Sequence, residues 1–530
     1  MRTRALLTVL ALAVLAAPWA RADEPPTYSS LANALPAPSL QGDLELSLAD
    51  AISLGLENNL GIEILRHQPL VSYEDARLAW APYDPTWNTE FGYSDDRLPT
   101  ANLLVGTDET VEEVLGGSGG ISAILPWLNT VITTQLDTAS TDSNVQFSSL
   151  SPGYNTGLTF VARQPLLRGL IWNETWSQVK ISQTIYAGAL EAFRRDVMDT
   201  VQAIEGSYWA LIADEERVRV AEKSVETAEA LLDQVTTQFE VGVVSKVEIA
   251  EADAGLAARQ FELITAQNRY QNTMDEAINL ILGPNLRADS RIQLEPTDRP
   301  DEFVPYQIDV LQASAIAMKQ RPELVIAQRE IDRLEINLKF AKNRRLPQFD
   351  IEGRYGHNGL AGRQNPAAVN QANAQFFGDW KDSFDPFSNS FAVRGILTVP
   401  LGNIEGRHSV SKAQLELRRA HVERRRVEQD VILEVRKAAR DLTSAQEGIE
   451  AADRRQVAAQ EQLRAERIRL EYGESTPFDV LLREQDLVAA QQEYIGAFQV
   501  YRNSVTGLDR AQGTILRNRN VSIEEAARLR

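Results

Sequence analysis

The sequence predicts a mainly helical protein made of two repeats, each combining a β-strand hairpin with a long pair of antiparallel helices. The first supporting observation is that the chain aligns with itself, so that Gly242 and Gly473, 231 positions apart, occupy equivalent places. The second is that several short segments alternate apolar and polar residues with a period of two, which is typical of strands. The third is a pair of long proline-free runs, residues 178–240 and 411–472, whose composition favours helix.

The N-terminus has the pattern of a secretory signal peptide, predicted to span residues 1–22. Two arginines precede an apolar run, and the letters "ARA" supply a small-x-small cleavage pattern. The run, residues 5–17, is too short for a membrane-spanning helix. Cleavage would remove three arginines and take the formal net charge from −20 to −23. An exported chain this acidic is a poor partner for nucleic acid, and none is expected to bind.

The first repeat is predicted at residues 46–294, after a Pro-rich N-terminal segment at 23–45. Its strands are expected at about 86–94 and 154–164, an extra hairpin at about 119–139, and its long helices at about 178–240 and 245–282. The extra hairpin is inferred because the offset between the two repeats falls from 262 to 235 between Pro85 and Pro165. The first repeat therefore holds 27 additional residues.

The second repeat is predicted at residues 307–516, after a linker at 295–306 and before a C-terminal tail at 517–530. Its strands are expected at about 347–357 and 390–401, and its long helices at about 411–472 and 477–515. Each first long helix measures roughly 95 Å at 1.5 Å per residue. A glycine between two helical runs predicts a turn between antiparallel helices.

The predicted strands each have one apolar face. Trp87, Phe91 and Tyr93 share one parity, while Asn88 and Glu90 take the other. The pattern fits a barrel with a watery lumen and a lipid-facing exterior, and it fits a half-buried sheet equally well. Four strands cannot close a water-filled barrel, so in a barrel several chains would contribute. The number of strands in each chain, four or six, stays open at this point.

The order of these parts resembles the outer-membrane efflux (TolC) family, from about Leu46 to Leu516. The most specific likeness lies in the two turn motifs, "FEVGVVSKVEIAEAD" (239–253) and "LEYGESTPFDVLLRE" (470–484). The letters "RQPLLRG" (163–169) resemble the family's exit from the first hairpin into the long helix. The absence of cysteine separates this chain from lipid-anchored members.

The resemblance implies a mainly α fold with a membrane β-barrel, in which a homotrimer forms a barrel of twelve or more strands continuous with a periplasmic α-helical tunnel. It implies a cell outer membrane location in a Gram-negative bacterium, contact with outer-membrane lipid, and no cofactor. The partners would be a periplasmic adaptor (membrane fusion) protein and an inner-membrane transporter. The duct would pass small molecules such as drugs and toxic compounds. Two alternatives are a type I protein secretion channel and, in another class, a soluble exported coiled-coil scaffold.

The resemblance also assigns roles to residues of the two turns. Turn and adaptor-docking positions are expected at Val241, Gly242, Val243, Tyr472, Gly473, Thr476 and Pro477. The periplasmic constriction, or gate, is expected at Asp479, Leu482 and Ser475. Leu482 stands where the family has a second acid and Ser475 where it has a basic partner, and Glu474, Arg483 and Glu484 are candidate substitutes.

Two of these assignments have a plainer interpretation. Asp479 follows Pro477 and would also suit the first turn of a helix, where an acid is stabilising. Glu248 and Glu251 occupy the matching places of the first repeat and are expected on the outer wall. There they form either a solvated face or an adaptor contact.

Enzymatic activity is not expected. The sequence contains no GxSxG, HExxH, GxxxxGK[ST] or CxxC motif. The absence of cysteine excludes thiolate metal sites, and no metal site is predicted. The letters "GGSGG" (116–120) lack the lysine of a phosphate-binding loop and are interpreted as a flexible turn.

Overall fold

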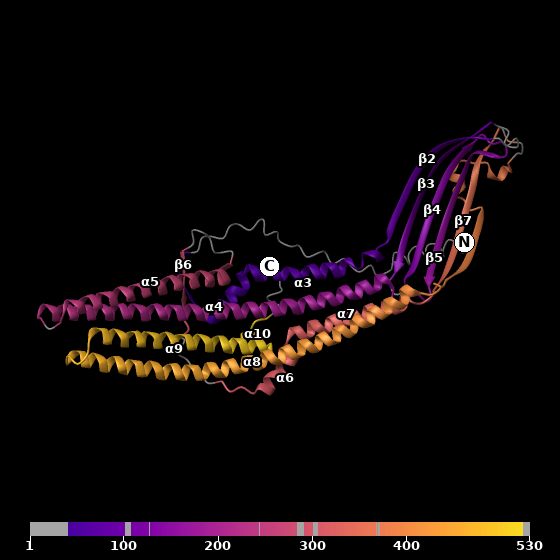
Figure 1. The fold of residues 1–530 in the computed structure, drawn as a ribbon. Helices are drawn as coiled ribbons and strands as arrows, with labels where there is room; N and C mark the ends of the chain where they lie inside the picture. Colours follow the sequence, from indigo (N-terminus) through magenta and orange to yellow (C-terminus); the bar gives the residue numbers. More distant parts are fainter. Residues whose placement is uncertain are drawn as a thin grey trace.

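A computed structural model describes residues 41–100, 108–126, 128–242, 244–283, 291–299, 306–366, 368 and 372–522. The predicted signal peptide and most of the predicted Pro-rich segment lie outside these ranges. The molecule is elongated, with an antiparallel sheet at one end and two helical turns at the opposite end (Figure 1). Within the described residues, no helix is both long and apolar enough to cross a membrane.

The sheet has six strands in the order β2-β3-β4-β5-β7-β8, and every neighbouring pair is antiparallel. The strands are β2 (Thr86–Pro99), β3 (Glu109–Leu125), β4 (Thr130–Ser143), β5 (Leu150–Pro165), β7 (Gln348–Gln364) and β8 (Ser388–Thr398). The extra hairpin of the first repeat is β3 and β4, and it lies within the sheet between β2 and β5. Of the two strand counts that the sequence left open, four and six, the described sheet has six.

The interpretation of residues 116–120 as a flexible turn is wrong, because "GGSGG" lies in the middle of β3 and pairs with β2 and β4. The glycines leave room for side chains of the neighbouring strand. A Cβ added to Gly117 would lie 2.8 Å from Cδ1 of Phe91. Glycine in a strand interior commonly marks such a close approach. The sequence alone could not show that an aromatic ring takes the place of the missing side chains.

The registers place the aromatic side chains of the sheet on one face. The edge strands expose them most: Trp87 is 75% exposed, Phe91 84% and Phe391 77%. The opposite face carries ion pairs, including Arg163 Nε to Asp350 Oδ2 at 2.8 Å. We call these the apolar face and the polar face of the sheet.

The long helices occupy the region between the sheet and the two turns (Figure 1). They are α3 (Leu60–Leu78), α4 (Glu174–Glu240), α5 (Lys246–Leu282), α7 (Pro322–Arg344), α8 (Ile404–Glu471) and α9 (Pro477–Gln512). α4 and α8 begin earlier than predicted because Asn173 and Asn403 cap their first turns through Oδ1. With 67 and 68 residues, each measures roughly 100 Å.

The neighbours of the two longest helices change along their length. Near the sheet the packing order is α3-α4-α7-α8, and towards the turns α5 and α9 pack against α4 and α8 instead (Figure 1). Four helices therefore continue from the sheet, and two helical hairpins, α4/α5 and α8/α9, form the far end.

Two short strands straddle the borders of the first repeat, where it meets the Pro-rich segment predicted at 23–45 and the linker predicted at 295–306. β1 (Gln41–Leu46) and β6 (Arg291–Pro296) form a parallel pair beside α2 (Leu48–Asn58). The pair covers the main core, because Leu46 and Leu294 are buried with Tyr208 of α4. The Tyr208 hydroxyl donates to Asp298 Oδ2 at 2.6 Å. In both segments the alternating apolar pattern is short and lies near proline. The pattern was therefore too weak to distinguish a strand from a linker.

The remaining described elements lie partly among the helices and partly beside the sheet. They are α6 (Val310–Gln320), α10 (Ile515–Asn518) and the short 3-10 helices η2 (Ala81–Tyr83), η4 (Ala374–Phe376) and η5 (Trp380–Phe384). The start of the C-terminal tail is part of the packed structure. Arg519 Nε lies 2.7 Å from Oε1 of Glu205, a carboxylate that is 0% exposed on α4.

Candidate functional site

Both helical hairpins turn through the same backbone device. Gly242 has φ +79° and Gly473 φ +72°, a left-handed conformation that glycine adopts without steric cost. Nothing lies within 4 Å of a Cβ built on either glycine. The preceding residues, Val241 and Tyr472, are 71% and 79% exposed. The two turns are therefore exposed at the end of the molecule. The third predicted position of the first turn, Val243, lies outside the described residues.

The helix that follows the second turn starts with a capping box. Thr476 Oγ1 donates to Asp479 Oδ2 at 2.7 Å, and the Asp479 N–H donates to Thr476 Oγ1 at 3.3 Å. Pro477 occupies the first helical position, where its missing N–H costs nothing. The hydrogen bonds from the Thr476 side chain and backbone lower the pKa of the Asp479 carboxyl. The predicted gate acid is thus ionised and engaged by its own helix.

The other two predicted gate residues differ in their relation to Asp479, because a side-chain hydrogen bond from Ser475 contributes to the lowered pKa of the Asp479 carboxyl, whereas none from Leu482 is possible. Ser475 Oγ donates to Glu466 Oε1 at 2.6 Å, so Ser475 is bound to the preceding helix of the same hairpin. Leu482 is 41% exposed. Among the substitutes, Arg483 pairs with Asp486 at 3.1 Å, one turn along α9, and the Glu474 N–H donates to the Arg469 carbonyl. Nothing in the sequence marked Glu466 as the partner of Ser475.

Glu484 is the unusual acid of this region. It is 2% exposed, and its Oε2 atom has no hydrogen-bond partner. Burial raises the pKa of the Glu484 carboxyl, while Arg467 and Arg259 act in the opposite direction. Arg259 is itself only 6% exposed on α5. The sequence offered Glu484 as a substitute, but its burial follows from packing between helices and has no sequence signal.

An apolar cluster ties the two hairpins together just behind the turns. It contains one or two buried residues from each of the four helices: Leu231, Val235, Ala252, Leu463, Leu470 and Val480. We call it the tip cluster. Glu248 and Glu251 lie outside it, with Glu251 exposed. Glu248 forms the capping box of α5, in which the Ser245 N–H donates to Glu248 Oε2 at 3.1 Å.

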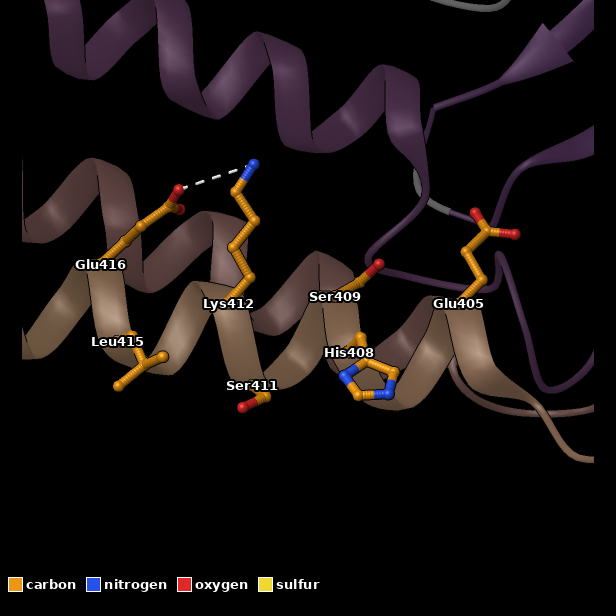
Figure 2. Close-up of a pocket in the computed structure, with 7 residues that line it drawn as sticks. All are labelled: Glu405, His408, Ser409, Ser411, Lys412, Leu415 and Glu416. Carbon is orange, nitrogen blue, oxygen red and sulfur yellow. Dashed lines mark ion pairs between the residues drawn. The ribbon is translucent and has the colours of Figure 1, made fainter.

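No arrangement for catalysis or metal binding is found in the part of the chain that the structure describes. There, no three His, Cys, Asp or Glu side chains gather into a possible metal site. Figure 2 shows a shallow depression along α8 near the sheet, with the labelled side chains spread along a single helix. Lys412 reaches Glu416 at 3.8 Å, an ordinary helix-surface pair.

Comparisons with known proteins agree with this elongated fold. A family model described as outer membrane efflux protein matches residues 122–283 and 314–514. No curated protein matches the sequence. The structure of the CmeC outer membrane channel of Campylobacter jejuni is similar, with a TM-score of 0.64 at 16% identity over 91% of this chain and 89% of that chain.

Two further solved structures give the same result. A CusC structure aligns with a TM-score of 0.64 at 16% identity, over 91% of this chain and 97% of that chain. The open state of the MtrE outer membrane channel of Neisseria gonorrhoeae aligns with a TM-score of 0.61 at 15% identity, over 88% and 89%. At such identities the likeness concerns the fold.

Proposed function

This chain belongs to the outer membrane efflux protein family, and we propose that it is the outer-membrane exit duct of a tripartite export system. It is a transport protein of the Gram-negative outer membrane with a periplasmic part, and it is not an enzyme. In the proposed system, small toxic molecules leave an inner-membrane transporter and cross periplasm and outer membrane in one passage. A periplasmic adaptor joins the transporter to the duct.

The observation that carries the proposal is the continuity of one chain from sheet to turns. A sheet with an exposed apolar face leads directly into helices of roughly 100 Å, which end in two bare glycine turns. The sheet suits lipid contact on its apolar face, and its charged polar face suits water. One chain encloses no lumen, so we propose that three copies surround a duct.

The end with the turns is the proposed docking region for the adaptor. Val241 and Tyr472 are large, exposed side chains beside the two glycines. The acids of the first hairpin, Glu248 and Glu251, would face outwards beside them. Exposed apolar groups rimmed by charge are typical of protein contact sites.

The constriction is proposed at the second turn. Three copies of Asp479 would form a ring of carboxylates that repel one another and attract cations. The capping box fixes the carboxylate position, and the lowered pKa keeps it charged at neutral pH. Asp479→Asn should weaken block by divalent cations in single-channel recordings, because Asn still accepts the Thr476 bond but carries no charge. Glu248→Gln, at the other turn, is the matched control and should leave block unchanged. Equal block by divalent cations in wild type and Asp479→Asn would show that Asp479 serves only as a helix-capping residue.

The function itself is tested in a deletion strain. We expect higher sensitivity to toxic compounds, restored by the wild-type chain. Unchanged sensitivity together with loss of an exported protein from the medium would favour type I secretion instead. Recovery of the mature protein from the soluble periplasm as an elongated monomer would favour the scaffold.

A further inference from the structure

Among the residues that the structure describes, none pairs with the outer side of either edge strand of the sheet, β2 or β8. All fourteen residues of β2 are exposed, as are ten of the eleven residues of β8. Backbone groups at a sheet edge must be paired if the sheet lies in lipid. Because six strands is an even number, β2 of a second copy would run antiparallel to β8 of the first. The edges are therefore compatible in direction.

The sheet is staggered as the wall of a barrel is staggered. Following the registers from β2 to β8, one row contains Thr86, Ser122, Thr133, Val161, Arg354 and Ala392. β8 continues six residues beyond Ala392, to Thr398. Those six residues span about 20 Å, and the sheet is about 24–29 Å wide at 4.8 Å per strand.

The stagger determines how far the strands are inclined to the axis of the proposed barrel. Both Thr86 and Thr398 lie at the helical end of the sheet, since Thr86 follows η2 and Thr398 precedes α8. Placing these two ends at the same height inclines the strands by about 35–40°, within the roughly 35–45° of membrane barrels. All six strands, including β3 and β4, share this inclination.

The same placement creates complementary pairs between copies. If Thr86 of one copy lies opposite Thr398 of the next, Glu90 meets Arg394 on the polar face. On the apolar face, Tyr93 meets Phe391 and Phe91 meets Val393. Opposite charges and aromatic pairs directly across two strands are stabilising. This register was chosen from the stagger alone, so the charge match is a separate observation.

We propose that β8 of each copy pairs with β2 of the next in this register, so that three copies close an eighteen-stranded barrel. The inference rests on the proposed trimeric duct and deepens it. Eighteen strands inclined in this way need a circumference of about 110 Å. Four helices continue from the sheet in each copy, and twelve helices spaced about 8–10 Å apart need about 100–120 Å. The barrel thus matches the circumference of the helical ring that continues from it.

The absence of cysteine allows a direct test. In the proposed register Ser94 lies opposite Ser390, and both are exposed serines on the polar face. The full-length double variant Ser94→Cys with Ser390→Cys should form disulfides between copies on mild oxidation in outer membranes. Cysteines directly opposite each other across two strands lie close enough for the bond. Three bonds close the ring, so a covalent trimer is expected on a non-reducing denaturing gel.

The matched control is Ser118→Cys with Ser390→Cys. Ser118 lies on the same face but in β3, where its neighbours are Glu90 and Asp137 of the same copy. This control should give no covalent trimer. A native trimer that rescues the deletion strain, but in which Ser94→Cys with Ser390→Cys forms no disulfide, would overturn the eighteen-stranded wall and leave the proposed exit duct intact. Failure of the wild-type chain to form any trimer would overturn both.

Discussion

The hairpin of α4 and α5 and the hairpin of α8 and α9 share a turn but differ in what surrounds it. Both have a glycine at positive φ, followed by a capping box at matching positions, Glu248 and Asp479. Beyond the caps they diverge. Five residues after Asp479, Glu484 is buried, whereas its counterpart Asp253 is exposed. Ser475, which bonds Glu466, corresponds to Val244, which packs on the tip cluster.

The comparison shows that the two repeats share the geometry of the turn but differ in the side chains around it. The glycine and the cap determine whether two helices can reverse direction, so both hairpins need them. The neighbouring side chains determine how one hairpin contacts the other, and those contacts are different on the two sides. The comparison can be tested by changing matched positions in both hairpins.

The largest effect is expected in the tip cluster, which both hairpins share. Leu463→Ala should destabilise the end of the molecule by about 2–4 kcal/mol, because the leucine is 5% exposed and leaves a cavity. Leu482→Ala, at a position 41% exposed, is the control and should cost much less. Hydrogen exchange of the α4/α5 and α8/α9 amides near the turns would report the change. Faster exchange in only one hairpin would show that the cluster does not couple them.

The turn glycines should respond equally. Gly242→Ala and Gly473→Ala should each cost about 1–2 kcal/mol, since the positive φ opposes a side chain and no neighbour clashes. Thermal unfolding of the two variants in detergent would measure this. A clear inequality would show that one turn is held by contacts with other copies.

A smaller difference is expected where Ser475 replaces the apolar residue of the first hairpin. Ser475→Ala removes the 2.6 Å hydrogen bond to Glu466 and should cost about 1 kcal/mol. Val244→Ala, the matched change in the first hairpin, removes apolar contact with the tip cluster instead. Urea unfolding at low and high salt distinguishes them, because only the bond to a carboxylate should weaken in salt. Equal salt dependence would contradict the assignment.

The smallest expected difference is one of pH dependence. Burial raises the pKa of Glu484, so the folded state holds its proton at pH values where the unfolded state has lost it. The free energy of unfolding should therefore fall as pH rises from the ordinary glutamate pKa through the raised one. Glu484→Gln should remove this slope, whereas Asp253→Asn should not. Unfolding midpoints across about pH 4–8 would measure it, and an unchanged slope in Glu484→Gln would refute it.

The elements of the fold that local patterns determine could be predicted from the sequence. Gly242 and Gly473 stand out because glycine and capping residues interrupt otherwise uninterrupted helix, and the repeat doubles the signal. The alternation of Trp87, Phe91 and Tyr93 identified β2 and its faces. The first half of β3 was missed because Gly116, Gly117 and the acids before them are poor strand formers, and only cross-strand packing makes them a strand.

The position of the second turn could be predicted from the sequence, whereas the contacts of its side chains could not. Pro477 and Asp479 indicate a helix start, which is the geometry found. The contacts of Ser475 and Glu484 depend on how α8 and α9 rotate about their axes and on the approach of α5. Neither the helix rotation nor the approach of α5 can be predicted from the local sequence. A buried glutamate therefore cannot be distinguished from an exposed one by sequence alone.

The bond between Arg519 and Glu205 has a consequence for synthesis of the chain. Glu205 is translated 314 residues before the arginine that neutralises it. A chain that ends before residue 519 keeps a carboxylate buried among the core residues of α4 without its cation, which is strongly destabilising. A polypeptide truncated just before Arg519 is therefore expected to be less stable than the full chain, although it keeps nearly all of the helical core.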